Sequence, residues 1–269
     1  IAVIKYIKSK MSEINYFYAN KSATKVLIGI KNYQLGIGEK MSNIMNKDVR
    51  NAITSRRSVR QFLSKDVSKG IIEEILNVAA RAPSGTNIQP WNVHVLTGKA
   101  RNKICKEASS AFLDPKVDKK NDRLHYMENF RDPYISRRRK VGWDLYALLD
   151  IKKGDYEKTK AFHVQNFNFF NAPVGLLFTI EKDLGWMSWL DYGMFLQNIC
   201  IAARGFGLDT CPQAAWGQMH KTLSPMLNIK DNHIIHCGIS LGYVDPKAEV
   251  NKLKTIREDL STFTTFHEK

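Results

Sequence analysis

The sequence lacks any run of eighteen apolar residues, about the length that a helix needs to span a bilayer, so we expect no membrane-spanning segment. Acidic residues are also scarce: 26 Asp and Glu face 41 Lys and Arg, and the formal net charge is +15. A charge of this size favours anionic partners such as nucleic acid. No RNA- or DNA-binding motif accompanies it, so we expect no nucleic-acid partner. A basic nucleic-acid-binding module is kept as a minor alternative.

Cysteine is scarce as well, and the four cysteines are far apart among apolar or small neighbours: Cys105, Cys200, Cys211 and Cys237. This spacing excludes a CxxC pair, and we expect no metal site. We interpret the four as reduced core thiols of a cytoplasmic protein. A catalytic thiol is a weaker alternative, because no His is placed as its base. The histidines are interpreted as surface or structural residues, among them His163, His220 and His236.

The chain has 269 residues and is 43% hydrophobic, enough for one large domain with an appendage. Residues 1–40 show no sustained periodicity and are expected to form a poorly ordered extension. Met41 is a plausible natural start, and residues 41–269 form the predicted domain. Within it, residues 98–150 are more polar and are interpreted as an inserted lid or loop region with a short helix from Trp143 to Leu149.

Helices and strands are predicted to alternate irregularly along this domain. Helices are expected at Lys47–Ser55, from an N-cap at Ser68 to Pro83, and at Trp186–Phe206; strands are expected at Trp91–Thr97, Val174–Ile180 and Ile234–Val244. The second helix has an apolar stripe of Ile72, Ile75, Leu76, Ala79 and Ala80. The helix Trp186–Phe206 is apolar on almost every side, so it must lie at the centre of the domain or in a large subunit interface.

Two segments are rich in groups that could bind a ligand. Arg56, Arg57, Ser58 and Arg60 place three guanidinium groups and a hydroxyl within five residues, which suits a phosphate, although taken alone the cluster favours a cationic helix end. The second segment is a loop between two prolines that is dense in amides and hydroxyls. It contains Pro83, Ser84, Gly85, Asn87 and Gln89. Such a loop can hydrogen-bond a heteroaromatic ring or serve only as a tight turn.

Together these two segments resemble the N-terminal signature of the FMN-dependent nitroreductase family. The matching residues are Arg-Arg-Ser-Val-Arg at 56–60 and Ala-Pro-Ser-Gly-Thr-Asn-Ile-Gln-Pro-Trp at 82–91. The similarity covers about residues 44 to 266 and continues through 166–175, 189–198, 207–216 and 237–243. The segment Val141-Gly-Trp-Asp-Leu-Tyr most resembles the branch that includes nitrobenzoate reductases.

The resemblance implies where FMN would be bound. Arg56, Ser58, Arg60 and Arg257 would hold its phosphate and ribityl chain, with Arg57 nearby. The loop residues Pro83, Ser84, Gly85, Asn87 and Gln89 would come from the other subunit and line the flavin. A third segment, beside the isoalloxazine, comprises Pro212, Gln213, Ala214 and Ala215. The Ala214 N–H would point at the flavin there. Many relatives have Glu-Gly in place of Ala214-Ala215, so this chain lacks that carboxylate.

The resemblance also implies an α+β fold with a mixed, mainly antiparallel sheet flanked by helices, in a homodimer with an exchanged C-terminal arm. NADH or NADPH would reduce FMN, and a nitro-aromatic compound or quinone would then be reduced in the same cleft by a ping-pong mechanism. Trp143 and Tyr146 are candidates for lining that cleft, although packing within a helix explains them equally. No catalytic side chain is expected, because the flavin carries the hydride chemistry. A reductive dehalogenase or enoate-type reductase of the same fold is the alternative.

Overall fold

The computed structural model describes residues 49–119 and 129–268. The sheet and the cavities described below belong to the compact unit that begins at Ala52. The predicted extension, residues 1–40, and Met41 lie outside the described residues. The helices are α3 (Val49–Ser55), α4 (Lys69–Ala79), α5 (Gly98–Leu113), α6 (Tyr134–Leu148), α7 (Tyr156–Val164), α8 (Trp186–Gly205) and α9 (His220–Leu227), with short 3-10 turns η1 (Gly85–Asn87), η2 (Gln165–Asn171), η3 (Ala214–Met219), η4 (Glu249–Lys252) and η5 (Leu260–Thr262).

The described sheet has four strands in the order β1-β2-β4-β3, and every neighbouring pair is antiparallel. The strands are β1 (Asn92–Thr97), β2 (Val174–Glu181), β3 (Asp209–Gln213) and β4 (His233–Gly242). One isolated parallel bridge joins Ser58 to Thr210. The α+β class with a mainly antiparallel sheet is therefore confirmed, and so are the three predicted strands. Strand β3 was not predicted.

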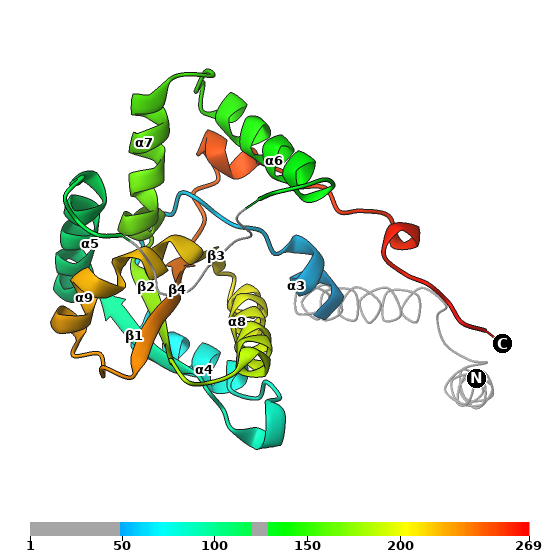
Figure 1. Ribbon diagram of the computed structural model, residues 1–269, viewed down its shortest axis with the longest axis horizontal. Coiled ribbons are helices and arrows are strands. Elements are labelled where there is room, and N and C mark those ends of the chain that lie inside the picture. The colour runs from blue at the N-terminus through cyan, green and yellow to red at the C-terminus, as the bar shows by residue number, and fades with distance from the viewer. Residues whose placement is uncertain (1–48, 120–128, 269) are drawn as a thin grey trace, which may run out of the picture. The chain divides into compact units, whose positions relative to one another are not determined.

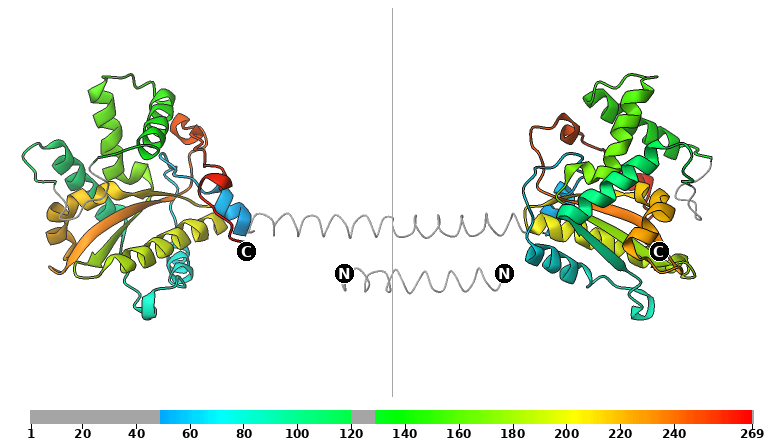
Figure 2. Two further views of the ribbon diagram at one scale, coloured as in Figure 1. Left: turned by 45° about the vertical axis from the view of Figure 1, so that its right-hand side comes forward. Right: turned by 90° about the vertical axis from the view of Figure 1, so that its left-hand side faces the viewer.

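Helices cover both faces of this sheet and divide the core into two clusters (Figures 1 and 2). Side chains alternate between the faces along β2: Leu176 and Phe178 pack with α4 and α8, whereas Leu177 packs with α5, α9, η2 and η3. Both clusters are apolar, so the central strands are buried on each side. This explains why β2 appears in the sequence as a continuous apolar run rather than an alternating one.

Two glycines let aromatic rings lie directly on the sheet. Phe169 and Trp216 stack with their ring centroids 4.2 Å apart. A Cβ atom at Gly175 would come within 2.2 Å of the Phe169 ring, and one at Gly238 within 2.4 Å of Trp216 Cδ1. Because Gly175 and Gly238 have no side chains, the rings of Phe169 and Trp216 can pack directly against the sheet. Trp216 in turn fixes the position of η3, which directly follows β3.

Helix α4 forms as predicted. The Ser68 hydroxyl accepts a hydrogen bond from the Ile71 N–H, as an N-cap does. Ile72 and Ile75 are buried against α8. Ala80, however, was wrongly assigned to the apolar stripe: it is the exposed C-cap residue, because the helix ends before its side chain reaches the core.

The prediction for residues 98–150 needs correction. Their first part is α5, and its Ile104 and Ala108 are buried in the second core cluster. The predicted short helix at Trp143–Leu149 is α6, which starts at Tyr134 and ends at Leu148. Much of this region is thus helix, and α5 belongs to the core rather than to an inserted loop. A lid role for α6 stays a prediction.

Helix α8 confirms the predicted long apolar helix, but one of its sides is uncovered in the single chain. Tyr192, Phe195 and Ile199 are buried against the sheet, whereas the side chains of Trp186 and Leu190 are 77% and 54% exposed. The exposed side of α8 is therefore an apolar face that the single chain leaves uncovered. Among the described helices, none combines the length and hydropathy needed to cross a membrane.

Candidate functional site

The segment that follows α3 is held at the edge of the sheet. Helix α3 ends at Ser55, and the chain then runs extended beside β3, where the Val59 N–H donates to the Thr210 carbonyl at 3.0 Å. The Val59 side chain is completely buried. Because side chains alternate along an extended chain, its neighbours Ser58 and Arg60 turn away from the core. Both line a cavity.

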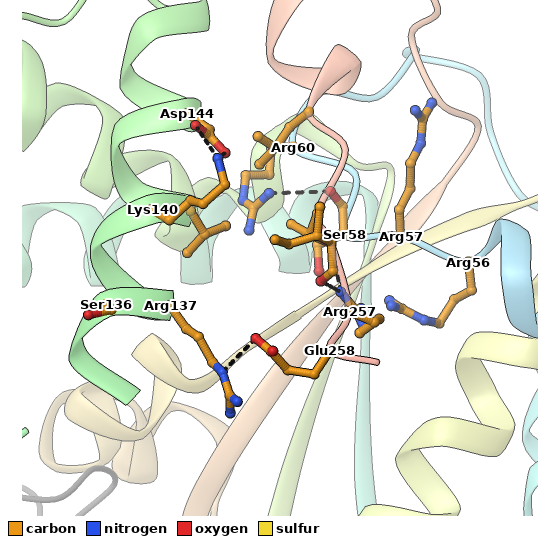
Figure 3. A pocket seen from close by; sticks show the side chains of 14 residues that line it. Arg56, Arg57, Ser58, Arg60, Ser136, Arg137, Lys140, Asp144, Arg257 and Glu258 are labelled. Carbon is orange, nitrogen blue, oxygen red and sulfur yellow. Dashed lines mark hydrogen bonds and ion pairs between the residues drawn. The ribbon is translucent and has the colours of Figure 1, made fainter. Parts of the chain in front are cut away.

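This cavity has a volume of about 620 Å³ and is built from three parts of the chain: residues 56–60, helix α6 and residues 253–258. Its lining residues are Arg56, Arg57, Ser58, Arg60, Ser136, Arg137, Lys140, Val141, Asp144, Leu253, Thr255, Ile256, Arg257 and Glu258 (Figure 3). Four arginines and the serine predicted for the phosphate are therefore brought together. The contribution of α6 to this site was not predicted from the sequence.

The charges around the cavity do not cancel. Six cationic side chains and two carboxylates line it, a surplus of four positive charges. Both carboxylates are paired with α6: Glu258 with Arg137 and Asp144 with Lys140, each at 2.9 Å. Within the described part of the chain, none of the four remaining arginines forms an ion pair with a carboxylate. This donor set of guanidinium groups and a hydroxyl fits a phosphate.

A second cavity of about 760 Å³ adjoins the first and shares Arg56, Arg57 and Arg257 with it. On its wall Arg204 Nη1 pairs with Asp209 Oδ1 at 2.8 Å, and Arg204 Nε donates to Ser55 Oγ at 3.2 Å. Burial raises the pKa of Asp209, and the charges of Arg204 and Arg57 oppose this shift. Arg204 thus links the end of α3 to the start of β3, a role that the sequence did not reveal.

The loop at η1 does not line either cavity. Its predicted flavin-contacting residues are Pro83, Ser84, Gly85, Asn87 and Gln89, and all but the half-buried Ser84 are exposed. Three non-glycine residues, Thr86, Asn87 and Gln89, have φ between 48° and 60°. Backbone strain of this kind persists only where surrounding contacts hold it, and it clusters at functional sites. The contacts here include Gln89 N to Ser84 Oγ at 3.0 Å and Gly85 N to Asp191 Oδ2 at 3.1 Å.

The predicted segment 212–215 lies at the end of β3 rather than in a free loop. Pro212 and Gln213 complete the strand, while Ala214 and Ala215 begin η3. The Gln213 side chain is buried: its Nε2 donates to the Asn166 carbonyl at 2.7 Å, and its Oε1 accepts from Ser240 Oγ at 2.7 Å. Gln213 therefore has only its backbone to offer a ligand.

The two predicted cleft residues do not reach these cavities. The cavity-facing side of α6 carries Lys140, Val141 and Asp144, whereas Trp143 and Tyr146 are absent from the lining of both cavities. Trp143 is 50% exposed, and the Tyr146 hydroxyl lies 3.2 Å from His163 Nε2 on α7. Tyr146 thus joins two helices, which matches the packing interpretation of this residue.

The thiols and histidines take part in packing. All four cysteines are free and buried, and burial raises the pKa of Cys211 to about 11. His220 Nδ1 accepts the Ile235 N–H at 3.3 Å, and His236 packs edge-on against Trp189. Among the described residues, no group of His, Cys, Asp and Glu is arranged to hold a metal ion. The expected cytoplasmic location stays a prediction.

Comparison with known proteins decides the family. The model of the nitroreductase family matches residues 53–243, well over half of the chain. The chain belongs to the nitroreductase family. It is 40% identical to the 4-nitrobenzoate reductase of Pseudomonas putida over 223 residues, which are 83% of this chain and 97% of that protein. It is also 38% identical to the chloronitrobenzene nitroreductase of Comamonas testosteroni over 214 residues, which are 80% and 94% of the two chains.

Among solved structures, the fold is similar to that of the FMN-dependent nitroreductase NfnB of Mycobacterium smegmatis in complex with NADPH. The TM-score is 0.77, the sequence identity is 28%, and the match covers 81% of this chain and 97% of the other. These relatives confirm the predicted place of this nitroreductase in the branch that resembles nitrobenzoate reductases.

Proposed function

We propose that this nitroreductase is an FMN-dependent oxidoreductase that uses NADH or NADPH to reduce nitro-aromatic compounds or quinones. The names of its relatives support the reaction, since two of them are a 4-nitrobenzoate reductase and a chloronitrobenzene nitroreductase. The related structures that hold FMN and NADPH support the cofactors. The observation in this chain that carries the proposal is the convergence of Arg56, Arg57, Arg60 and Arg257 on one cavity, where none of them pairs with a carboxylate of the described residues.

Arg56, Arg57, Ser58, Arg60 and Arg257 would hold the phosphate of FMN. When bound, FMN would supply the redox chemistry between the reduced nicotinamide and the second substrate. The chain itself would bind and orient the cofactor: its guanidinium groups would donate to the phosphate oxygens, and the Ser58 hydroxyl would add a neutral donor. No side chain of this chain is assigned as an acid or base.

We also propose that the protein works as a homodimer. The exposed side of α8 with Trp186 and Leu190 supports an interface, because contiguous exposed apolar surface marks contact sites. The C-terminal segment adds further exposed apolar side chains, with Phe263 70% and Phe266 71% exposed, as an arm that docks on a partner would. In such a dimer the strained η1 loop would line the flavin of the other subunit, since it lines neither cavity of its own.

The test is FMN affinity in arginine variants. Arg60→Ala and Arg257→Ala each remove a charge-assisted contact worth about 1.5 to 3 kcal/mol, so FMN should bind about 10 to 150 times more weakly. Arg139→Ala is the matched control: it removes an arginine from α6 that does not line the cavity, and FMN affinity should be unchanged. A wild-type protein that takes up no FMN, and does not oxidise NADH or NADPH in the presence of 4-nitrobenzoate, would refute the function.

Other functions are less well supported. A dehalogenase or enoate-type reductase would share the FMN site. The two relatives named above, however, reduce nitro compounds according to their names, and each aligns with this chain over more than nine tenths of its own length. A nucleic-acid-binding module does not account for the family match over residues 53–243. A small electron-poor aromatic compound therefore remains the proposed substrate, with no nucleic-acid or membrane partner proposed.

A further inference from the structure

Asn251 is a buried polar residue whose side chain is fully used. It lies in η4 and is 5% exposed. Its Oδ1 accepts from the Arg60 N–H at 2.8 Å, and its Nδ2 donates to the carbonyls of Gln61 and Asp245 at 2.8 and 2.9 Å. An amide has one acceptor oxygen and two N–H donors, so this arrangement satisfies every group it has.

These contacts join two of the three parts of the chain that line the cavity of about 620 Å³, residues 56–60 and residues 253–258. Arg60 lies in the first segment and Arg257 in the second, and both side chains line the cavity. Backbone bonds align the first segment with the chain after β4: Asp245 N donates to Gln61 O at 3.1 Å, and Leu63 N donates to Tyr243 O at 2.9 Å. Among the hydrogen bonds of the described residues, those of Asn251 link η4 to the backbone of Arg60 and Gln61.

The position of the Arg60 guanidinium is determined mainly by the position of the Arg60 backbone. Its Nη1 lies 3.4 Å from the Ser58 carbonyl, at the long end of hydrogen-bond range. A change in the Arg60 backbone would therefore move the guanidinium. The Arg257 side chain is held by its own neighbours, with Nη1 donating to Thr255 Oγ1 and the Ile256 carbonyl at 2.9 Å each. The distance between the two arginines is thus set by how the segments are joined rather than by contacts between the side chains.

We propose that Asn251 is a positioning residue for the phosphate-binding part of the cavity. It fixes the Arg60 backbone relative to the segment that carries Arg257, so that both guanidinium groups can reach one phosphate. The inference rests on the proposed FMN-dependent function. Asparagine is required because a carboxylate lacks the two donors. An apolar side chain would leave the Arg60 N–H without this acceptor and would remove one donor from each of the Gln61 and Asp245 carbonyls.

The test compares two ligands that differ by one phosphate. FMN and riboflavin are titrated into the apoprotein of wild type, Asn251→Asp, Asn251→Ser and Asn251→Ala, and flavin fluorescence gives each Kd. The three variants should bind FMN at least about tenfold more weakly. Their affinity for riboflavin should stay within about twofold of wild type, so the preference for FMN falls. A purely structural role would weaken both ligands together.

The matched control is Tyr192→Phe, which also removes buried hydrogen bonds but at a residue that lines neither cavity. The Tyr192 hydroxyl lies 2.9 Å from the Asn92 carbonyl oxygen and 3.0 Å from that of Thr179, and its single proton is shared between these two acceptors. This variant should melt at a lower temperature with an unchanged FMN preference. If wild type binds FMN and the folded Asn251 variants keep the wild-type preference for FMN over riboflavin, the inference about Asn251 is wrong but the proposed function stands. The inference is also wrong if all three Asn251 variants fail to fold. If wild type binds neither flavin, the proposed function itself is wrong.

Discussion

Gly238→Ala should destabilise the protein because Trp216 occupies the space that the methyl group needs. The added Cβ would lie 2.4 Å from Trp216 Cδ1 and 2.9 Å from Nε1, whereas ordinary contact begins at 3.4 Å. The indole would have to shift by about 1 Å at its nearest atom. It cannot do so freely, because its ring is fully buried, stacked on Phe169 and edge-on to Phe167 at 5.5 Å. Overpacking of this kind costs about 1 to 3 kcal/mol.

In a protein of this size 1 kcal/mol corresponds to about 2 to 4 °C, so the melting temperature should fall by about 2 to 12 °C. The assay is thermal and urea unfolding of the apoprotein at one fixed protein concentration, since flavin and subunit association would add stability. Gly142→Ala is the control. A Cβ there, in the interior of α6, has nothing within 4 Å, and the better helix propensity should raise stability by up to about 1 kcal/mol.

A double variant separates crowding from other causes. If the methyl group acts by displacing the indole, Gly238→Ala combined with Trp216→Leu should cost less than the sum of the two single changes. Melting of Gly238→Ala at or above the wild-type temperature would refute the reasoning, and so would strict additivity in the double variant.

Other predictions concern chemistry and the η1 loop. Because burial raises the pKa of Cys105 and Cys211 to about 11, few thiolates form at neutral pH, and iodoacetamide treatment of the native enzyme should leave turnover largely intact. Asp191→Ala removes the acceptor of the Gly85 N–H and should cost about 1 to 3 kcal/mol in urea unfolding, while Asp191→Asn should cost much less. In anaerobic stopped-flow, no single His, Asp or Glu replacement that keeps FMN bound should slow flavin bleaching by orders of magnitude.

Elements with strong local signals could be predicted from the sequence. Helix α4 has a serine cap and Ile72 and Ile75 at helical spacing, so its start and buried face were visible. Helix α5 was missed because small or moderately apolar residues such as Cys105, Ala108 and Ala111 fill its buried side, and its other side is rich in charge. Burial of these residues depends on the shape of the neighbouring helices and is not signalled by hydropathy.

Strand β3 was missed for a related reason. It has five residues, begins with Asp209 and contains Pro212, which usually argues against a strand. Proline is tolerated here because β3 is the last strand in the β1-β2-β4-β3 order.

The candidate site was predicted unevenly. Residues 56–60 and Arg257 were assigned through family resemblance, whereas Asn251 and the contribution of α6 depend on tertiary contacts between segments far apart in sequence.

The hydrogen bond between Arg60 and Asn251 spans 191 positions of the chain, which has a consequence for biosynthesis. A ribosome adds residues in order, and segments fold as they emerge. Both core clusters are supplied almost entirely by residues up to 244, so they can assemble before η4 and Arg257 have left the ribosome. The cavity lined by the arginines is therefore the last of these features to be completed. A nascent chain arrested before residue 251 should therefore hold a packed sheet but retain no flavin, and cofactor loading becomes a mark that synthesis has passed the end of η4.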